Sequence, residues 1–148
     1  MVAGDEFDLA ILSAADYDSV LALWRQAGLH TRPAGRDSAE QFARQLAGGT
    51  QTVLGLRAEG MLVGVAVVTH DGRKGWINRL AVHPDFRRRG AGKRLIAEAE
   101  HLLHAQGIGI MAALIEDWNT SSLALFQGAG YTLHPDIYYL TKRDSDEV

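Results

Sequence analysis

The chain has 148 residues, of which 47% are hydrophobic and 22% charged, with a formal net charge of −3 and no cysteine. This length suits one globular domain with a substantial core, so we expect a single domain over residues 1–148. The lack of cysteine excludes disulfide bonds, thiolate catalysis and Cys-containing zinc sites. The slightly negative charge argues against a general nucleic-acid-binding protein.

The start of the chain does not have the pattern of a secretion signal. Residues 1–8 lack a charged segment followed by an apolar one, and no apolar run in the sequence reaches membrane-spanning length. We therefore expect a cytoplasmic protein that acts without a membrane or nucleic-acid partner.

In the first half of the chain, hydrophobic spacing and turn residues predict a strand, two helices and a hairpin. The expected elements are a strand at residues 7–12, helices capped at Ser13 and Ser38 that end at Gly28 and Leu46, and hairpin strands at 52–57 and 61–70. The second hairpin strand is almost entirely apolar, which is typical of a central strand with both faces covered.

The second half predicts a strand–helix–strand unit, in which the two strands run parallel, followed by a helix and a closing pair of strands. The expected elements are a strand at 76–82, a helix that opens after a basic loop and ends before Gly107, a strand at 108–115, a helix from about Asn119 to Gly130, an antiparallel pair at 131–133 and 137–141, and a charged, frayed tail at 142–148.

The stretch Leu80–Leu95 joins a strand to a helix through a basic loop that contains glycine. Gly90 and Gly92 allow a ligand close to the backbone, and the first amides of a helix have no intrahelical acceptor. An anion at a helix N-terminus gains about 0.3–2 kcal/mol, so a phosphate group fits here. The basic side chains that add charge are Arg87, Arg88, Arg89, Lys93 and Arg94.

This stretch resembles the coenzyme A signature of the GNAT acyltransferase superfamily. Leu-Ala-Val-His-Pro at residues 80–84 corresponds to the end of the strand that precedes the family's signature loop. Arg87-x-x-Gly90-x-Gly92 corresponds to the loop itself. The loop is neither a Walker motif nor a Rossmann fingerprint, because no Gly-Lys-Ser/Thr and no Gly-x-Gly-x-x-Gly is present. A phosphate-dependent nucleotide-binding domain is therefore disfavoured.

A second stretch, residues 119–131, is similar to the family's other signature. Asn119 matches the Asn that follows strand five, Ser122 takes the place of an Ala, and Gly130-Tyr131 stands for Gly-Phe. In the family Asn119 would bond the pantetheine arm or the substrate end of the cleft, but Asn also favours a helix N-cap for its own sake. Both roles can hold at once.

The resemblance implies an α/β fold, a mixed sheet of about six to seven strands with four helices packed on both faces. It also implies acetyl transfer from acetyl-CoA, used as a cosubstrate, to an amine of a small molecule or peptide by direct nucleophilic attack. Dimers are common in the family, which leaves a homodimer open. The implied coenzyme-binding residues are Leu80, Ala81, Val82, Arg87, Arg88, Arg89, Gly90, Ala91, Gly92, Lys93, Asn119 and Phe126.

The general acid and base are not evident from the sequence. Many relatives carry a Glu on strand four, whereas this chain has Asn78 and Arg79 there. The Tyr that often protonates the departing thiolate is replaced by Phe126, whose ring cannot donate a proton. The candidate catalytic residues are Glu116, Asn78 and Tyr138. Asp117 is an alternative to Glu116, and Tyr131 and Tyr139 are alternatives to Tyr138.

Because no general acid is evident, an alternative function remains, a non-catalytic coenzyme A-binding sensor or interaction module.

Two further groups of residues are considered for binding. Arg32 and Arg36 lie in a loop that usually borders the acceptor site in this family, so they either pair with a carboxylate-bearing substrate or are solvated. His101 and His104 lie one turn apart but on the solvent side of a helix, so we expect no metal.

Overall fold

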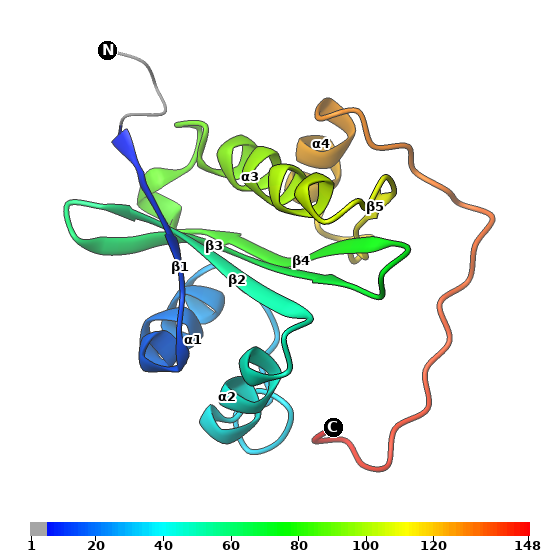
Figure 1. Ribbon diagram of the computed structural model, residues 1–148, viewed down its shortest axis with the longest axis horizontal. Helices are drawn as coiled ribbons and strands as arrows, with labels where there is room; N and C mark the ends of the chain where they lie inside the picture. Colours follow the sequence, from blue (N-terminus) through cyan, green and yellow to red (C-terminus); the bar gives the residue numbers. More distant parts are fainter. Residues whose placement is uncertain (1–5) are drawn as a thin grey trace.

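The computed structural model describes residues 6–148, and within this range five strands form one mixed sheet in the order β1–β2–β3–β4–β5 (Figure 1). The strands are β1 (Asp8–Ile11), β2 (Gln51–Ala58), β3 (Met61–His70), β4 (Gly75–Val82) and β5 (Met111–Ala112). Neighbours from β1 to β4 are antiparallel, and β5 pairs parallel to β4. The hairpin and the parallel strand–helix–strand unit are therefore confirmed.

Helices cover both faces of this sheet, as expected for the α/β class. In Figure 1, α1 (Tyr17–Gln26) and α2 (Ala39–Ala47) lie on one face, and α3 (Ala91–Ala105) and α4 (Thr120–Gly128) lie on the other. The predicted cap of α2 is present, since the Ser38 side chain accepts from the Gln41 amide. The Ser13 side chain accepts from the Ala15 amide, but it caps a 3-10 helix at Ala14–Asp16 that precedes α1, and Asp16, the N-cap of α1, makes no side-chain cap bond. None of the helices described in residues 6–148 is both long enough and apolar enough to cross a membrane.

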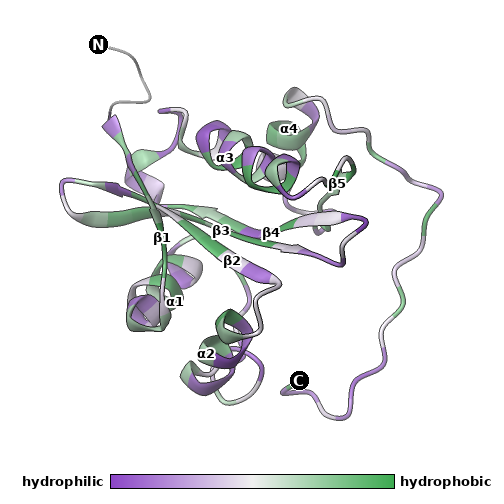
Figure 2. Ribbon diagram, viewed as in Figure 1, coloured by the Kyte–Doolittle hydropathy of each residue, from purple (hydrophilic) through white to green (hydrophobic). Residues whose placement is uncertain are grey.

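The sheet separates two hydrophobic clusters, which explains the continuous apolar run of β3. Val65 and Val67 face the cluster under α1 and α2, whereas Ala66 and Val68 face the cluster under α3. Hydropathy colouring shows much green in β2 and β3 and purple patches on α1, α2 and α3 (Figure 2). A strand buried on both sides cannot alternate between apolar and polar residues, so β3 reads as apolar throughout.

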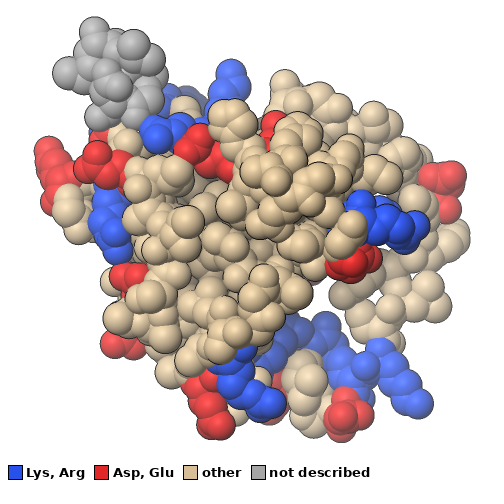
Figure 3. Space-filling view, in the orientation of Figure 1, with Lys and Arg blue, Asp and Glu red and all other residues tan. Residues whose placement is uncertain are grey.

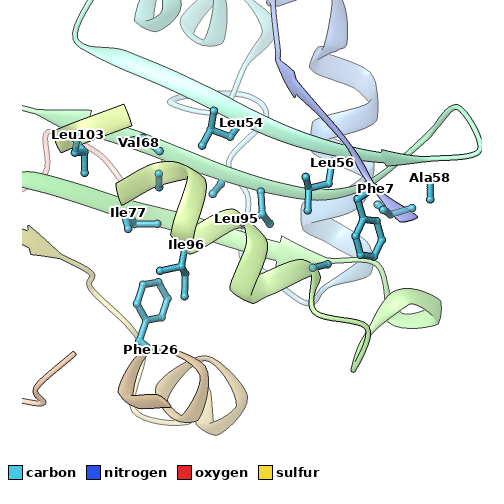
Figure 4. Close-up of a cluster of buried hydrophobic side chains, with 14 of the residues drawn as sticks. Phe7, Leu54, Leu56, Ala58, Val68, Ile77, Leu95, Ile96, Leu103 and Phe126 are labelled. Atoms are coloured by element: carbon cyan, nitrogen blue, oxygen red, sulfur yellow. The ribbon is translucent and has the colours of Figure 1, made fainter. Parts of the chain in front are cut away.

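Helix α3 is the centre of the larger cluster. Leu95 and Leu103 are fully buried, and Ile96 is 2% exposed. Figure 4 shows Ile96 next to the ring of Phe126, which projects from α4 toward α3. Packing therefore holds α3 between the sheet and α4, and it keeps the N-terminal end of α3 beside the end of β4.

Leu95→Ala should lower the free energy of unfolding by about 2–5 kcal/mol, because the substitution removes a buried side chain and leaves a cavity in a packed core. Chemical denaturation monitored by circular dichroism measures this loss. Leu9→Ala is the matched control, since Leu9 is 39% exposed, and it should cost much less. Equal losses for the two variants would contradict the placement of Leu95 in the core.

The prediction for the end of the chain is wrong in two respects. Residues 131–133 and 137–141 form no strands, and β5 spans only Met111–Ala112 of the expected 108–115. The sheet thus has five strands within the described residues, not six or seven. Residues 132–148 are exposed and run apart from the sheet (Figure 1), with Ile137 69% and Leu140 85% exposed.

Residues 137–141 form no strand because a strand needs the free edge of another strand to pair with. Local sequence predicts an extended, apolar conformation for 137–141, but β5 presents only a two-residue edge to which it could add. The part of the sequence prediction that concerns residues 1–5, the absence of a secretion signal, lies outside the described residues.

Candidate functional site

The site begins where β4 and β5 separate. Their pairing is limited to Gly75 with Met111 and Trp76 with Ala112, after which the strands diverge. On its other side β4 has an irregularity opposite β3, where Val65 pairs with Ala81 but Val67 pairs with Asn78. Two residues of β4 thus stand opposite one of β3, which is a bulge that bends the strand and re-aims its side chains.

Arg79 lies within this bulge and has φ of 51°, a left-handed conformation that is rare outside glycine. Contacts of its guanidinium hold it there. The group lies 4.1 Å from the centre of the Trp24 ring, its Nη1 lies 3.5 Å from Oδ1 of Asp37, and its Nη2 donates to the carbonyl of His30 at 3.0 Å. Burial lowers the pKa of Arg79, and the Asp37 carboxylate opposes that shift.

The loop between β4 and α3 forms the second part of the site. It passes through a short 3-10 helix at Pro84–Phe86, and Arg88 and Gly90 then adopt positive φ values of 63° and 83°. Gly90 is the N-cap of α3, and its carbonyl accepts from the amide of Arg94. The left-handed turn lets the chain enter α3 with the first amides of the helix at the mouth of the loop.

A cavity of about 900 Å³ lies against this loop. Its walls come from the end of β4, the loop, the start of α3 and the start of α4. Every predicted coenzyme-binding residue except Arg89 and Phe126 lines it: Leu80, Ala81, Val82, Arg87, Arg88, Gly90, Ala91, Gly92, Lys93 and Asn119. The structure thus brings together two motifs that are about 30 residues apart in the sequence.

Arg89 and Phe126 lie elsewhere. Arg89 forms an ion pair with Glu6 at 2.9 Å, and its guanidinium lies 4.9 Å from the centre of the Phe86 ring. Phe126 is 4% exposed and lines a second, smaller cavity. It packs edge-on to the ring of Tyr131, with the ring centres 5.1 Å apart, so it forms a wall.

The smaller cavity, of about 320 Å³, adjoins the larger one. It lies where β4 and β5 diverge, and Ile77, Arg79 and Glu116 are among its lining residues. The residues that line both cavities are Leu29, Leu80, Trp118, Asn119 and Ser122. The two cavities therefore adjoin along a shared wall, and together they are called the groove below.

Of the three candidate catalytic residues, the structure places only Glu116 in the groove. Asn78 sits in β4 between two lining residues but lines neither cavity, and Tyr138 is 87% exposed on the C-terminal segment, also outside both. Asn78 lies outside both cavities because alternate residues of a strand point to opposite faces, and its neighbours Ile77 and Arg79 line the smaller cavity. Tyr138 is outside because the strand expected to carry it does not form.

Asn119 caps α4 and also lies in the wall of both cavities. Its side-chain oxygen accepts from the amide of Ser122 at 3.3 Å, which is an N-cap of α4, and the residue also lines both cavities. The cap holds the start of α4 next to the groove. Any ligand contact by Asn119 therefore begins from an amide that is already oriented.

The sequence reasoning did not single out Trp118, which lines both cavities and is 60% exposed. A large aromatic residue between a strand and an N-cap Asn was the available signal, because exposed aromatic groups mark ligand or partner surfaces. Arg79 was noted only as a strand residue. The position of Arg79 beside the smaller cavity depends on the bulge in β4, which no local sequence pattern indicates.

Tyr131 is unsuited to act as an acid in the groove. Its hydroxyl donates to Oε2 of Glu100 on α3 at 2.7 Å. Burial and this hydrogen bond raise the pKa of Tyr131 well above its usual value. The hydroxyl therefore joins the end of α4 to α3, which is a structural role.

Tyr131→Phe should lower the free energy of unfolding by about 1 kcal/mol, because a partly buried hydrogen bond to a carboxylate is lost. Thermal and chemical denaturation measure this change. Tyr139→Phe is the matched control, since Tyr139 is 69% exposed, and it should change little. If Tyr131→Phe abolished catalysis while leaving stability intact, the structural role would be refuted.

Comparison with known proteins extends the resemblance over most of the chain. The model of the acetyltransferase (GNAT) family matches residues 17–131. Acetyltransferase YE1169 of Yersinia enterocolitica is 28% identical over 136 residues, covering 92% of this chain and 94% of that protein.

Two solved structures share the fold. The PaiA N-acetyltransferase of Thermoplasma acidophilum, in complex with coenzyme A, is 18% identical with a TM-score of 0.75 and covers 86% of this chain and 91% of that one. Aminoglycoside N-acetyltransferase AAC(6')-Iy, in complex with CoA, is 22% identical with a TM-score of 0.76 and covers 93% of this chain and 95% of that one.

Proposed function

Because the chain belongs to the acetyltransferase (GNAT) family, we propose that it moves an acetyl group from acetyl-CoA to an amine by direct attack. The observation that carries this proposal is the pair of adjoining cavities, one at the N-terminal end of α3 and one at the gap between β4 and β5. One end of the groove suits a pyrophosphate and the other a small acceptor. The shared lining residues mark the place where the two substrates would meet.

The phosphate end of the groove fits the coenzyme by charge and by backbone shape. Arg87, Arg88 and Lys93 line it, and no carboxylate among residues 6–148 lies within ion-pair distance of them. Unpaired cations beside free helix amides favour a phosphate group. Gly92 keeps this helix start close to α4, since a Cβ there would lie 2.7 Å from Cδ2 of Leu125.

The chemical end would use main-chain groups. Leu80 and Val82 line the groove at the end of β4, where the bulge and the divergence from β5 expose the backbone. A backbone amide aimed at a developing oxyanion is worth about 3 kcal/mol in a transition state. The donor supplies an acyl thioester, whose thiolate, with a free thiol pKa of about 8.5, leaves without a dedicated acid more easily than an alkoxide would.

The acceptor amine needs a base. A lysine-like amine with a pKa of about 10.4 is about one part in a thousand neutral at pH 7, a deficit of about 4–5 kcal/mol. We assign the base to Glu116, the predicted candidate that lines the acceptor end. In the reaction the amine nitrogen forms a bond to the acetyl carbon, the carbon–sulfur bond breaks, Glu116 takes the amine proton directly or through water, and solvent protonates the thiolate.

Titration calorimetry with acetyl-CoA, followed by an assay of free thiol release over a panel of amines, tests this function. We expect binding and acceptor-dependent release. Absence of acetyl-CoA binding would refute the proposal.

Two observations favour the alternative of a non-catalytic coenzyme A-binding module. Phe126 occupies the usual acid position, and the Tyr131 hydroxyl is engaged by Glu100. Binding of acetyl-CoA without thiol release from any amine would support this alternative, whereas turnover with a single acceptor would exclude it.

A further inference from the structure

The walls of the smaller cavity carry an uneven distribution of charge. Arg36 and Arg79 both line it, and both approach the same carboxylate, that of Asp37. Asp37 is 9% exposed, and its Oδ2 also accepts from the amide of Arg32 at 2.7 Å. One buried carboxylate is thus shared between two guanidinium groups, which leaves excess positive charge on this wall.

Arg79 has hydrogen-bonding capacity left over. Its Nη1 and Nη2 each carry two N–H donors, and each has one contact described above, Nη1 with the Asp37 carboxylate and Nη2 with the carbonyl of His30. A second donor on each nitrogen is left for the carboxylate of a ligand. Its position in the strained bulge and its stacking on Trp24 hold the planar group in one orientation, as recognition of a planar anion requires.

The loop that carries Arg36 already lies against an acidic segment of the same chain. The carbonyl of Glu147 accepts from the amide of Arg36 at 3.2 Å, and Asp144 and Asp146 precede it in the sequence. In Figure 1 the end of the chain lies beside the loop that leads into α2. In the space-filling view, blue and red side chains lie close together at the lower edge of the molecule (Figure 3).

Glu116 is also among the lining residues of this cavity. The cavity therefore offers guanidinium groups for an anion and a carboxylate for an amine. A volume of about 320 Å³ suits a small molecule. A polycation would meet Arg36 and Arg79 with like charge, which disfavours it.

Building on the proposed acetyl transfer, we propose that the acceptor is a small amine that also carries a carboxylate, such as an amino acid or a short peptide. Arg79 and Arg36 hold its carboxylate, and its amine is directed to Glu116 and the shared part of the groove. The arginines are binding residues that set specificity, and they take no part in proton transfer.

The test is a titration of amino acids, their amides and a polyamine into the protein saturated with coenzyme A. Arg–carboxylate pairs are charge-assisted, so we expect each acid to bind about tenfold more tightly than its amide, and the polyamine to bind weakly. Equal binding of acid and amide, tighter binding of the polyamine, or no binding of any acid would overturn the proposal.

Substitutions of the two arginines test whether these residues bind the carboxylate of the acceptor. Arg36→Gln and Arg79→Gln should bring the acid-to-amide ratio close to one, whereas Arg73→Gln, in the exposed turn between β3 and β4, should leave the ratio unchanged. An unchanged ratio in Arg36→Gln would refute the assignment even if Arg79→Gln failed to fold. Because binding is read without turnover, this test is independent of the thiol-release assay, whose failure would refute only the proposed function.

Discussion

Glu116→Gln is expected to lower kcat/KM for acetyl transfer by about 100-fold or more at pH 7, which is typical of the loss of a general base. The substitution keeps the size of the side chain and removes only its ability to take a proton. Glu116 is exposed and lines the acceptor end of the groove, so the fold should be unaffected. A coupled assay of thiol release, with denaturation as a check on stability, measures the result.

The pH profile separates loss of a base from loss of binding. Below the amine pKa, each unit of pH raises the neutral fraction of the acceptor tenfold, so the Gln variant should recover activity as the pH rises. Asp117→Asn is the matched control, because Asp117 is the next residue, is exposed, and lines neither cavity. Wild-type activity in Glu116→Gln at pH 7 would exclude this residue as the base.

Gly90→Val should weaken acetyl-CoA binding by about tenfold or more. Gly90 has φ of 83° at the N-cap of α3, and a β-branched residue in that conformation costs about 1–3 kcal/mol. The turn would relax toward negative φ, which moves the first amides of α3 away from the phosphate end of the groove. Titration calorimetry measures the change in Kd.

Gly107→Val is the matched control for this substitution. Gly107 has φ of 81° at the other end of α3, and no atom lies within 4 Å of a Cβ built there, as is also true of Gly90. The backbone strain is therefore similar, but Gly107 lines neither cavity. Both variants should lose similar stability, and only Gly90→Val should lose affinity. Equal loss of affinity would show that strain alone, and not the loop, controls binding.

The gathering of residues 80–93 at the wall of the larger cavity was predictable because its determinants are local. The turn at Gly90, the basic side chains and the helix start all lie within Leu80–Leu95, so a short stretch specifies them together. The smaller cavity was not predictable in the same way. Trp24, Asp37 and Arg79 come from three distant parts of the chain, and only folding brings them into contact.

Two of the three candidate catalytic residues, Asn78 and Tyr138, line neither cavity. Where such side chains lie depends on strand period and on strand pairing, which the residue types do not specify. The bulge in β4 changes which residues of that strand face the groove, and no local pattern indicates it. The C-terminal segment is apolar and extended, as predicted, yet it stays exposed because β5 offers too short an edge.

Short stretches of sequence specify the helices, the doubly covered β3, the α/β class and the glycine turn that opens α3. These features depend on hydrophobic period, on capping side chains and on glycine conformation, all of which act over a few residues. Tertiary contacts set where β4 and β5 part, bring Arg79 and Arg36 to the same carboxylate of Asp37, and place Glu116 in the wall of the smaller cavity. Those outcomes depend on contacts between residues distant in the chain, whose free energies appear only when the sheet and helices are packed together.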